Sequence, residues 1–221
     1  MKVYKGIHSG TLGATVSVNS KYGQVVRTRP RRTRKDTHAR QLARQRVTCF
    51  AQLWRTLTDQ QHAAWLALGQ QTPCAASAEP DAHPHGCQML VKINCALAAA
   101  GLPPVKDAPK RVKFGPHPVK RLHITKRQGA LKLELELDRA PKACLLVFGS
   151  RPCSAGIYVR NTYSIIGLLR APRRGRNNIT DLYVQKFGVP PAGTRVFIRA
   201  RQFLNGWEDQ SQDTHARVPS P

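Results

Sequence analysis

Residues 27–68 read RTRPRRTRKDTHARQLARQRVTCFAQLWRTLTDQQHAAWLAL, and the rest of the chain is interpreted outward from this stretch. Its first part, residues 27–46, holds nine Lys or Arg and a single acid, Asp36. Apolar residues then recur every three or four positions, which is the period of one face of an amphipathic helix. These residues are Ala43, Val47, Phe50, Trp54 and Leu57. The stretch therefore predicts a basic arm that leads into a helix.

Two threonines mark the expected helix starts. Thr37 can cap the first helix, because a hydroxyl satisfies a free backbone amide of the first turn. Thr58 begins a second helix, and Gln61 is three residues later, as a capping box requires. If the two helices fold back on each other, Trp54 and Trp65 meet at the centre. We expect a small helical module with no catalytic groups.

Charge is the strongest feature of the composition, at a formal +24 on 221 residues. Residues 1–70 carry 13 basic and 2 acidic side chains, residues 71–109 carry 2 and 3, and residues 110–221 carry 21 and 7. Such self-repulsion favours an anionic partner, and the phosphate backbone of nucleic acid is the commonest one. An acidic protein surface is the alternative.

No apolar run is long enough to span a bilayer, and the N-terminus lacks a secretory signal core, so we expect a cytoplasmic or virion protein without a membrane partner.

The expected fold class is α+β, in four segments. Residues 1–36 form a β-hairpin, with Val16 and Val18 facing Val25 and Val26, and the basic arm. Residues 37–101 form the helical module, including a third helix over residues 86–100 that ends at Gly101. Residues 102–117 form a Pro-rich linker.

Residues 118–218 change to a period of two, which predicts an antiparallel β-sandwich. Asn205-Gly206 is a hairpin signal between its last strands. Residues 177–188 break the alternation and suggest a helical turn inserted between strands.

Candidate catalytic and metal-binding groups are few. Glu134 and Glu136 lie on the same face of a predicted strand. Because they alternate with leucines, we interpret this face as the solvent-exposed, wet side of the strand. The glycines of residues 6–13 do not fit a nucleotide-binding loop. The six cysteines contain no CxxC pair, and we expect buried free thiols. A zinc site in one loop remains an alternative. Its potential ligands are Cys74, His83, His85, Cys87 and Cys95. We expect no enzyme activity, no catalytic residue and no cofactor.

The basic segments are the positive functional signal. Arginine outnumbers lysine in them, which suits bidentate contact with phosphate. The residues predicted to contact nucleic acid are Arg27, Arg29, Arg31, Arg32, Arg34, Lys35, Arg40, Arg44, Arg173, Arg174 and Arg176. No aromatic RNA-recognition pattern accompanies them, so the expected binding is independent of base sequence.

The order GIHSGTLGATVSV, KYGQVVRTRP and QLARQRVTCFAQLWRTLTDQQHAAW resembles a loose group of uncharacterised bacterial proteins found among phage and prophage genes. The matching positions are Gly10, Gly13, Gly23, Arg27, Gln41, Arg44, Trp54, Leu57, Thr58 and Trp65. The final strands resemble the closing hairpin of a fibronectin type III-like sandwich. The resemblance implies a phage-type structural or assembly protein. A homo-oligomer or larger assembly is expected separately, because a hairpin with Val16, Val18 and Val25 offers an edge for pairing. The alternative is a ribosome- or nucleoid-associated nucleic-acid-binding protein.

Overall fold

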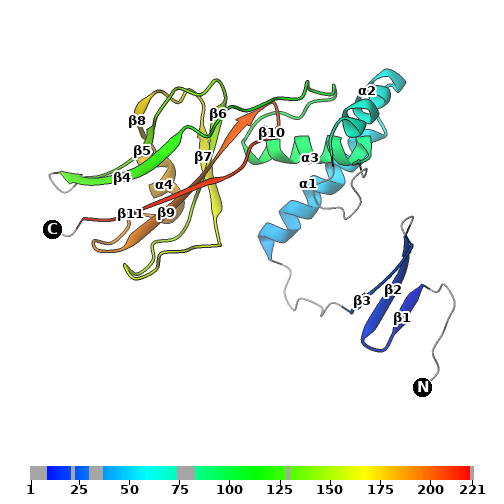
Figure 1. Ribbon diagram of the computed structural model, residues 1–221, viewed down its shortest axis with the longest axis horizontal. Helices are drawn as coiled ribbons and strands as arrows, with labels where there is room; N and C mark the ends of the chain where they lie inside the picture. Colours follow the sequence, from blue (N-terminus) through cyan, green and yellow to red (C-terminus); the bar gives the residue numbers. More distant parts are fainter. Residues whose placement is uncertain (1–8, 21–22, 30–36, 74–82, 128–129, 220–221) are drawn as a thin grey trace. The chain divides into compact units, whose positions relative to one another are not determined.

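The computed structural model describes residues 9–20, 23–29, 37–73, 83–127 and 130–219. These residues form four helices and eleven strands, and every strand pair is antiparallel, so the predicted α+β class is confirmed (Figure 1). The chain divides into two compact units, residues 1–44 and 45–221. No described helix is long and apolar enough to cross a membrane.

The N-terminal unit contains a three-stranded sheet in the order β1–β2–β3. Its strands are β1 (Gly10–Leu12), β2 (Thr15–Ser20) and β3 (Gly23–Thr28). The predicted hairpin is confirmed, and Val18 lies opposite Val25, but Val16 lies opposite Arg27 and Val26 opposite Ser17, so the expected facing of Val16 and Val26 is wrong. Strand β1 was not predicted. Leu12, Val18, Val25 and Val26 are exposed, so the described sheet buries little apolar surface.

Helix α1 (His38–Trp54) starts in the N-terminal unit and continues into the second unit. The amide of Arg40 donates to Thr37 Oγ1 at 3.4 Å, which supports Thr37 as the predicted cap. The predicted apolar face is buried at Phe50 but not at Val47, which is 49% exposed. The expectation of a continuous buried stripe is therefore wrong for the described part of α1.

Helix α2 (Asp59–Gln70) begins with the predicted capping box. The Gln61 amide donates to Thr58 Oγ1 at 3.3 Å, and the Thr58 amide donates to Gln61 Oε1 at 3.0 Å. The two bonds satisfy the backbone amides of Thr58 and Gln61, which have no carbonyl partner within the helix. Residues 58–61 are therefore sufficient to determine where α2 begins.

Helix α3 (Gly86–Ala99) also lies where the sequence predicts a helix. It ends at Gly101, whose φ is +70°, and the amides of Leu102 and Gly101 donate to the carbonyls of Leu97 and Ala98. This pair of bonds is a Schellman motif, which closes the last turn. At the other end, a Cβ on Gly86 would lie 2.8 Å from Leu66 N, so α2 and α3 approach closely only because this residue is glycine.

Trp65 of α2 is the centre of the helical core, with 0% exposure. Its Nε1 donates to Lys106 O at 2.7 Å. Trp54 is half-buried instead, and its ring centroid lies 4.4 Å from that of His62. The expectation that both tryptophans occupy the centre is wrong, because α2 turns Trp65 inward between α3 and the following segment.

Residues 102–117 lie against the helices. Asn94 of α3 is fully buried; its Nδ2 donates to Val105 O at 3.0 Å and its Oδ1 accepts from Val105 N at 2.7 Å. Gln61 Nε2 donates to Asp107 Oδ1 at 2.8 Å. These bonds attach the proline-rich segment to α2 and α3.

Eight strands follow, in two antiparallel sheets. The first has the order β4–β5–β8, from β4 (Val119–Arg127), β5 (Ala130–Leu137) and β8 (Gly175–Asn178). The second has the order β10–β9–β6–β7, and β11 also pairs with β9. Its strands are β6 (Cys144–Gly149), β7 (Ser164–Leu169), β9 (Arg195–Leu204), β10 (Trp207–Glu208) and β11 (Gln212–Arg217).

One core joins the two sheets and helix α4 (Thr180–Phe187). Leu133, Leu135 and Leu137 of β5 contribute to it, as do Val196 and Ile198 of β9. Tyr183 of α4 is fully buried in this core and donates from its hydroxyl to Ser150 O at 2.8 Å. The burial raises the pKa of Tyr183. Helix α4 confirms the helical turn predicted for residues 177–188.

A second core joins α2 and α3 to the other face of β6, β9 and β10. Leu146, Phe203 and Trp207 of the strands pack in it with Trp65 and Leu90 of the helices. The predicted Asn205-Gly206 hairpin is confirmed, with φ of +51° and +80°. It packs so tightly on α3, beside β10 in Figure 1, that a Cβ on Gly206 would lie 2.4 Å from Ile93 Cγ2. Residues 45–221 are one compact unit, whereas the sequence divided them into a helical module, a linker and a sheet region.

Candidate polyanion interface

Eight of the eleven residues predicted to contact nucleic acid belong to the N-terminal unit, residues 1–44. Arg27 lies on β3, Arg29 follows it, and Arg40 and Arg44 lie on α1; all four are exposed. Arg31, Arg32, Arg34 and Lys35 lie outside the described residues. The described cations of this unit thus sit on a strand end and on the first two turns of a helix.

Of the other predicted cations, Arg173 and Arg174 lie on the connection into β8, and Arg176 lies on β8 itself. Arg173 and Arg174 are exposed, and Arg176 lies 3.7 Å from a carboxylate oxygen of Glu134. Asn177 is buried and holds the connection together: it accepts from Arg173 N at 2.9 Å and donates to Arg173 O at 2.7 Å. The backbone is therefore held while the Arg173 and Arg174 side chains point to solvent.

Strand β9 carries three arginines that the sequence analysis did not single out. Arg195, Arg199 and Arg201 alternate with Val196, Ile198 and Ala200, which belong to the core between the sheets. Because successive side chains of a strand point to opposite faces, the arginines lie together on the outer face. The sequence RVFIRAR carries this signal, because its three arginines all occupy odd-numbered positions and so lie on the same face of a strand.

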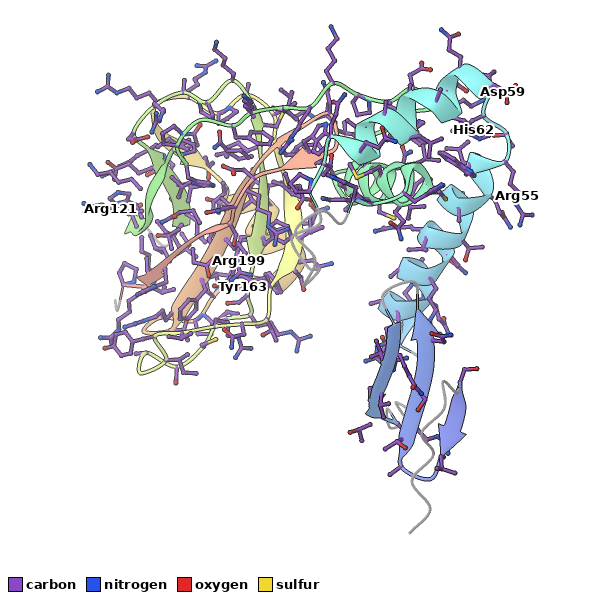
Figure 2. The ribbon with its side chains drawn as sticks, turned by 45° about the vertical axis from the view of Figure 1, so that its right-hand side comes forward. Arg55, Asp59, His62, Arg121, Tyr163 and Arg199 are labelled. Carbon is purple, nitrogen blue, oxygen red and sulfur yellow. The ribbon has the colours of Figure 1, made fainter. Side chains whose placement is uncertain are left out.

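Each of these arginines lies against an aromatic ring. The guanidinium carbon is 3.9 Å from the Tyr158 centroid for Arg195, 4.2 Å from Tyr163 for Arg199, and 5.2 Å from Phe148 for Arg201. Figure 2 shows Tyr163 beside Arg199. Rings over guanidinium planes give a cation–π contact and leave N–H groups at the edge for an anion.

Acids neutralise part of this face. Asp213 of β11 takes two bonds from Arg199, at 2.6 Å and 2.7 Å, and Glu208 lies 2.6 Å from Arg201 Nη1. The bonds to Arg199 hold the pKa of Asp213 below its usual range. Burial raises the pKa of Tyr163, and the neighbouring Asp213 carboxylate adds to the rise. Arg199 and Arg201 are thus internally paired.

Arg195 differs from its neighbours because it is 9% exposed and forms no ion pair with any described acid. Its Nε and Nη1 atoms are buried without a hydrogen-bond partner among the described residues, and so is Nε of Arg160. A desolvated cation without a counter-charge is costly, and it attracts an anion more strongly than an exposed one does. This part of the sheet therefore favours an anionic ligand.

A pocket of about 270 Å³ opens beside these residues. It is lined by Gly149, Ser150, Arg151, Arg160, Thr162, Tyr163, Ser164 and Phe187, and none of these described lining residues is acidic. Its two guanidinium groups and the hydroxyls of Thr162 and Ser164 are donors suited to an oxyanion.

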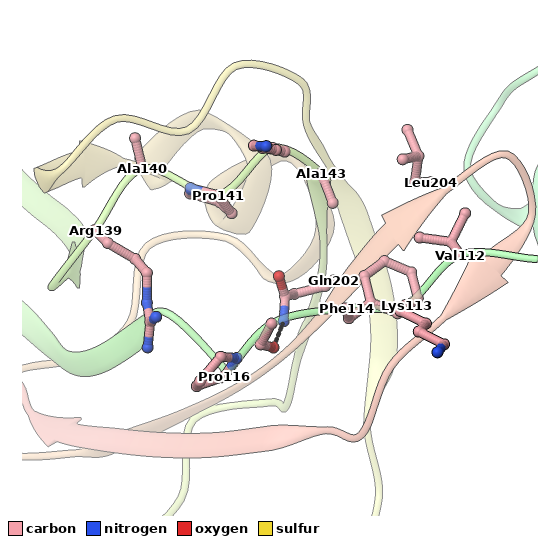
Figure 3. A pocket seen from close by; sticks show the side chains of 12 residues that line it. Val112, Lys113, Phe114, Pro116, Arg139, Ala140, Pro141, Ala143, Gln202 and Leu204 are labelled. Atoms are coloured by element: carbon pink, nitrogen blue, oxygen red, sulfur yellow. Dashed lines mark hydrogen bonds between the residues drawn. The ribbon is translucent and has the colours of Figure 1, made fainter.

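A second groove, of about 470 Å³, has a different character. Its floor is buried Gln202, whose Nε2 donates to Gly115 O at 2.9 Å and to Asp209 Oδ2 at 3.0 Å. In Figure 3, Gln202 lies between Arg139 and Lys113. Prolines, alanines, Phe114 and Leu204 complete a mainly apolar lining.

Glu134 and Glu136, the candidate catalytic carboxylates of β5, are held in ion pairs. Glu134 lies 2.8 Å from Lys132 Nζ, and it is buried, so its assignment to the wet side of the strand is wrong. The cause is its place on β5, the middle strand of its sheet, where Lys132 and Arg176 cover it. Glu136 accepts from His123 Nε2 at 2.5 Å, a bond that lowers the pKa of Glu136.

The candidate zinc ligands have other roles in the described structure. His83 Nδ1 lies 3.1 Å from Thr72 O, and His85 Nδ1 accepts from the Cys87 amide at 3.2 Å, capping α3. Cys74 lies outside the described residues. Across the described part of the chain, no three potential ligands come together around a metal position. The described thiols are free, but Cys49 is exposed and Cys153 alone among them is buried, so uniform burial was a wrong expectation.

Comparison with protein-family models, with curated proteins and with solved structures finds no match for this chain.

Proposed function

We propose that the protein is a non-enzymatic binding protein whose cationic surfaces contact the phosphate backbone of nucleic acid, independently of base sequence. The observation that carries the proposal is the charge of the N-terminal unit: residues 1–44 contain eleven Lys or Arg and one acid, a net +10. A unit of this size has too few acids to neutralise itself. An external polyanion would lower its self-repulsion.

The residue types support phosphate as the preferred anion. Seven of the eleven cations are arginine, whose planar fork matches two oxygens of one phosphate. The described members, Arg27, Arg29, Arg40 and Arg44, are exposed and reachable. An acidic protein would use the same charges, and it is the competing outcome of the test below.

A second candidate function is a structural or assembly role of phage type, in the cytoplasm or in a virion. It is favoured by the exposed valines of the N-terminal sheet, Val18, Val25 and Val26, which offer a surface for another copy or a partner. In this proposal residues 118–218 are a β-sandwich of fibronectin type III-like kind. The shared core between two antiparallel sheets supports the sandwich assignment.

Size-exclusion chromatography with light scattering and absorbance at 260 and 280 nm separates these functions. Protein should be run at about 50 mM and about 1 M salt, since phosphate contacts weaken steeply with salt. Nucleic acid that coelutes at low salt and dissociates at high salt supports the proposal. A nucleic-acid-free oligomer that persists at high salt supports the assembly role and contradicts the phosphate-binding one.

A further inference from the structure

The pocket beside β9 has the composition of a site for a single phosphate group. Arg151 and Arg160 supply guanidinium donors, and Thr162 and Ser164 supply hydroxyls. Its volume of about 270 Å³ is large enough for one tetrahedral oxyanion with water around it. The lining contains no acid, and the nearby carboxylate of Asp213, which accepts from the Tyr163 hydroxyl at 3.3 Å, is neutralised by Arg199.

The surroundings of the pocket add positive potential. Arg195 lies behind the same connection between β6 and β7: its backbone pairs with Cys153, two residues after Arg151. Its buried guanidinium nitrogens, and Nε of Arg160, have no partner among the described residues. Burial weakens solvent screening, so an anion in the pocket is attracted by Arg195 without touching it.

The pocket also has a firm base. Ser150 donates its backbone amide to Phe197 O at 3.1 Å and accepts at its carbonyl from the buried Tyr183 hydroxyl at 2.8 Å. Cys153 exchanges two backbone bonds with Arg195, at 3.0 Å and 2.8 Å. These bonds fix the backbone on both sides of Arg151, which limits the backbone entropy lost when a ligand binds.

An exposed aromatic ring lies two residues before Arg160. Tyr158 is 66% exposed, although Arg195 covers one face of its ring at 3.9 Å. The other face is available to a planar group. Stacking of bases on aromatic rings, combined with arginines that hold the backbone, is how proteins bind single strands without reading sequence.

We infer that this pocket binds one phosphate of a single-stranded nucleic acid and that Tyr158 stacks on a neighbouring base. The inference rests on the proposed function, because it assigns a location on the C-terminal unit to phosphate contact. Duplex DNA offers no unstacked base to Tyr158, so the site prefers single strands.

The test is fluorescence anisotropy with a labelled 20-nucleotide oligo(dT) and a duplex of equal length, over a series of salt concentrations. The Arg151→Ala/Arg160→Ala variant should bind oligo(dT) at least tenfold more weakly. Its slope of log K against log salt should fall by about 0.7 for each lost phosphate contact. Tyr158→Ala should lose about tenfold, as expected for one stacked base, and Tyr158→Phe should keep the wild-type affinity.

The control is Lys120→Ala/Lys126→Ala, which removes two exposed cations from β4 in the other sheet. It should change the affinity less than threefold. Thermal melting of every variant reports whether folding is intact. Equal losses in the Arg151/Arg160 variant and the control would overturn the pocket while leaving general phosphate binding standing. Absence of nucleic-acid binding by the wild-type protein at low salt would instead overturn the proposed function.

Titration with inorganic phosphate separates the two sources of this ligand chemistry. If the pocket binds a phosphate of a single strand, the Arg151/Arg160 variant must lose affinity for oligo(dT). A variant that loses a phosphate-binding signal but retains full oligo(dT) affinity would make the pocket a site for the free ion and contradict the inference.

Discussion

Replacing Trp65 with alanine should remove the largest single contribution to the helical core. The side chain is fully buried among α2, α3 and the outer faces of β6 and β9. Truncation of a buried aromatic costs about 3–5 kcal/mol through lost transfer energy and the cavity left behind. The lost hydrogen bond to Lys106 O, which leaves that carbonyl without its partner, adds about 1 kcal/mol.

The expected total for Trp65→Ala is therefore about 4–6 kcal/mol of unfolding free energy. For a chain of this length it corresponds to a fall in Tm of roughly 8–24 °C. Urea unfolding followed by far-UV circular dichroism measures the free energy, and calorimetry measures Tm. Trp54→Ala is the matched control, because Trp54 is half-buried and makes its ring contact with His62.

We expect Trp54→Ala to cost about 1–2 kcal/mol, in keeping with its partial burial. Equal losses for the two variants, or a larger loss for Trp54→Ala, would refute the assignment of Trp65 as the centre of the core. A loss below about 1 kcal/mol for Trp65→Ala would do the same.

Three further predictions concern a tight glycine turn, one ion pair and the charge of the basic arm. Gly206→Ala should lower stability by at least about 2 kcal/mol in urea unfolding, since a Cβ there meets Ile93 and φ is +80°; Asn205→Gly is the control and should be nearly neutral. Because Arg199 lowers the pKa of Asp213, this pair stabilises the fold above the ordinary pKa of Asp, and the contribution is lost as pH falls through the lowered value. Asp213→Asn should thus reduce stability at neutral pH and flatten the acid limb of a Tm-versus-pH profile; an unchanged profile would contradict the assignment. Replacing Arg31, Arg32 and Arg34 together with alanine should weaken nucleic-acid binding in anisotropy without changing Tm, and intact binding would move the main contact to the C-terminal unit.

Much of the local structure is predictable because its signals act over a few residues. The Thr58–Gln61 capping box and the Gly101 helix end each involve bonds between residues no more than five positions apart. The Asn205-Gly206 turn was recognised for the same reason, since its conformation depends on two residues that tolerate positive φ.

The candidate site was predicted less completely. Charge density pointed to Arg173 and Arg174, which are exposed, but not to Arg151, Arg160 and Arg195, which are spread over a loop and a distant strand. Arginines separated in sequence do not form a visible run. Only strand pairing between β6 and β9 brings Cys153 and the segment around it beside Arg195.

The sequence by itself determined the α+β class, the starts of α1 and α2, the glycine that closes α3, two hairpins and the excess of positive charge. These depend on local backbone preferences and on composition, neither of which requires knowledge of the fold. Tertiary structure alone decided that Trp65 rather than Trp54 is buried, that Glu134 is covered, and that helices and strands share a core. Whether a side chain is buried depends on the residues that pack around it, which can be distant in sequence. Trp65 bonds to a carbonyl 41 residues away, and no pattern within one helix contains that partner.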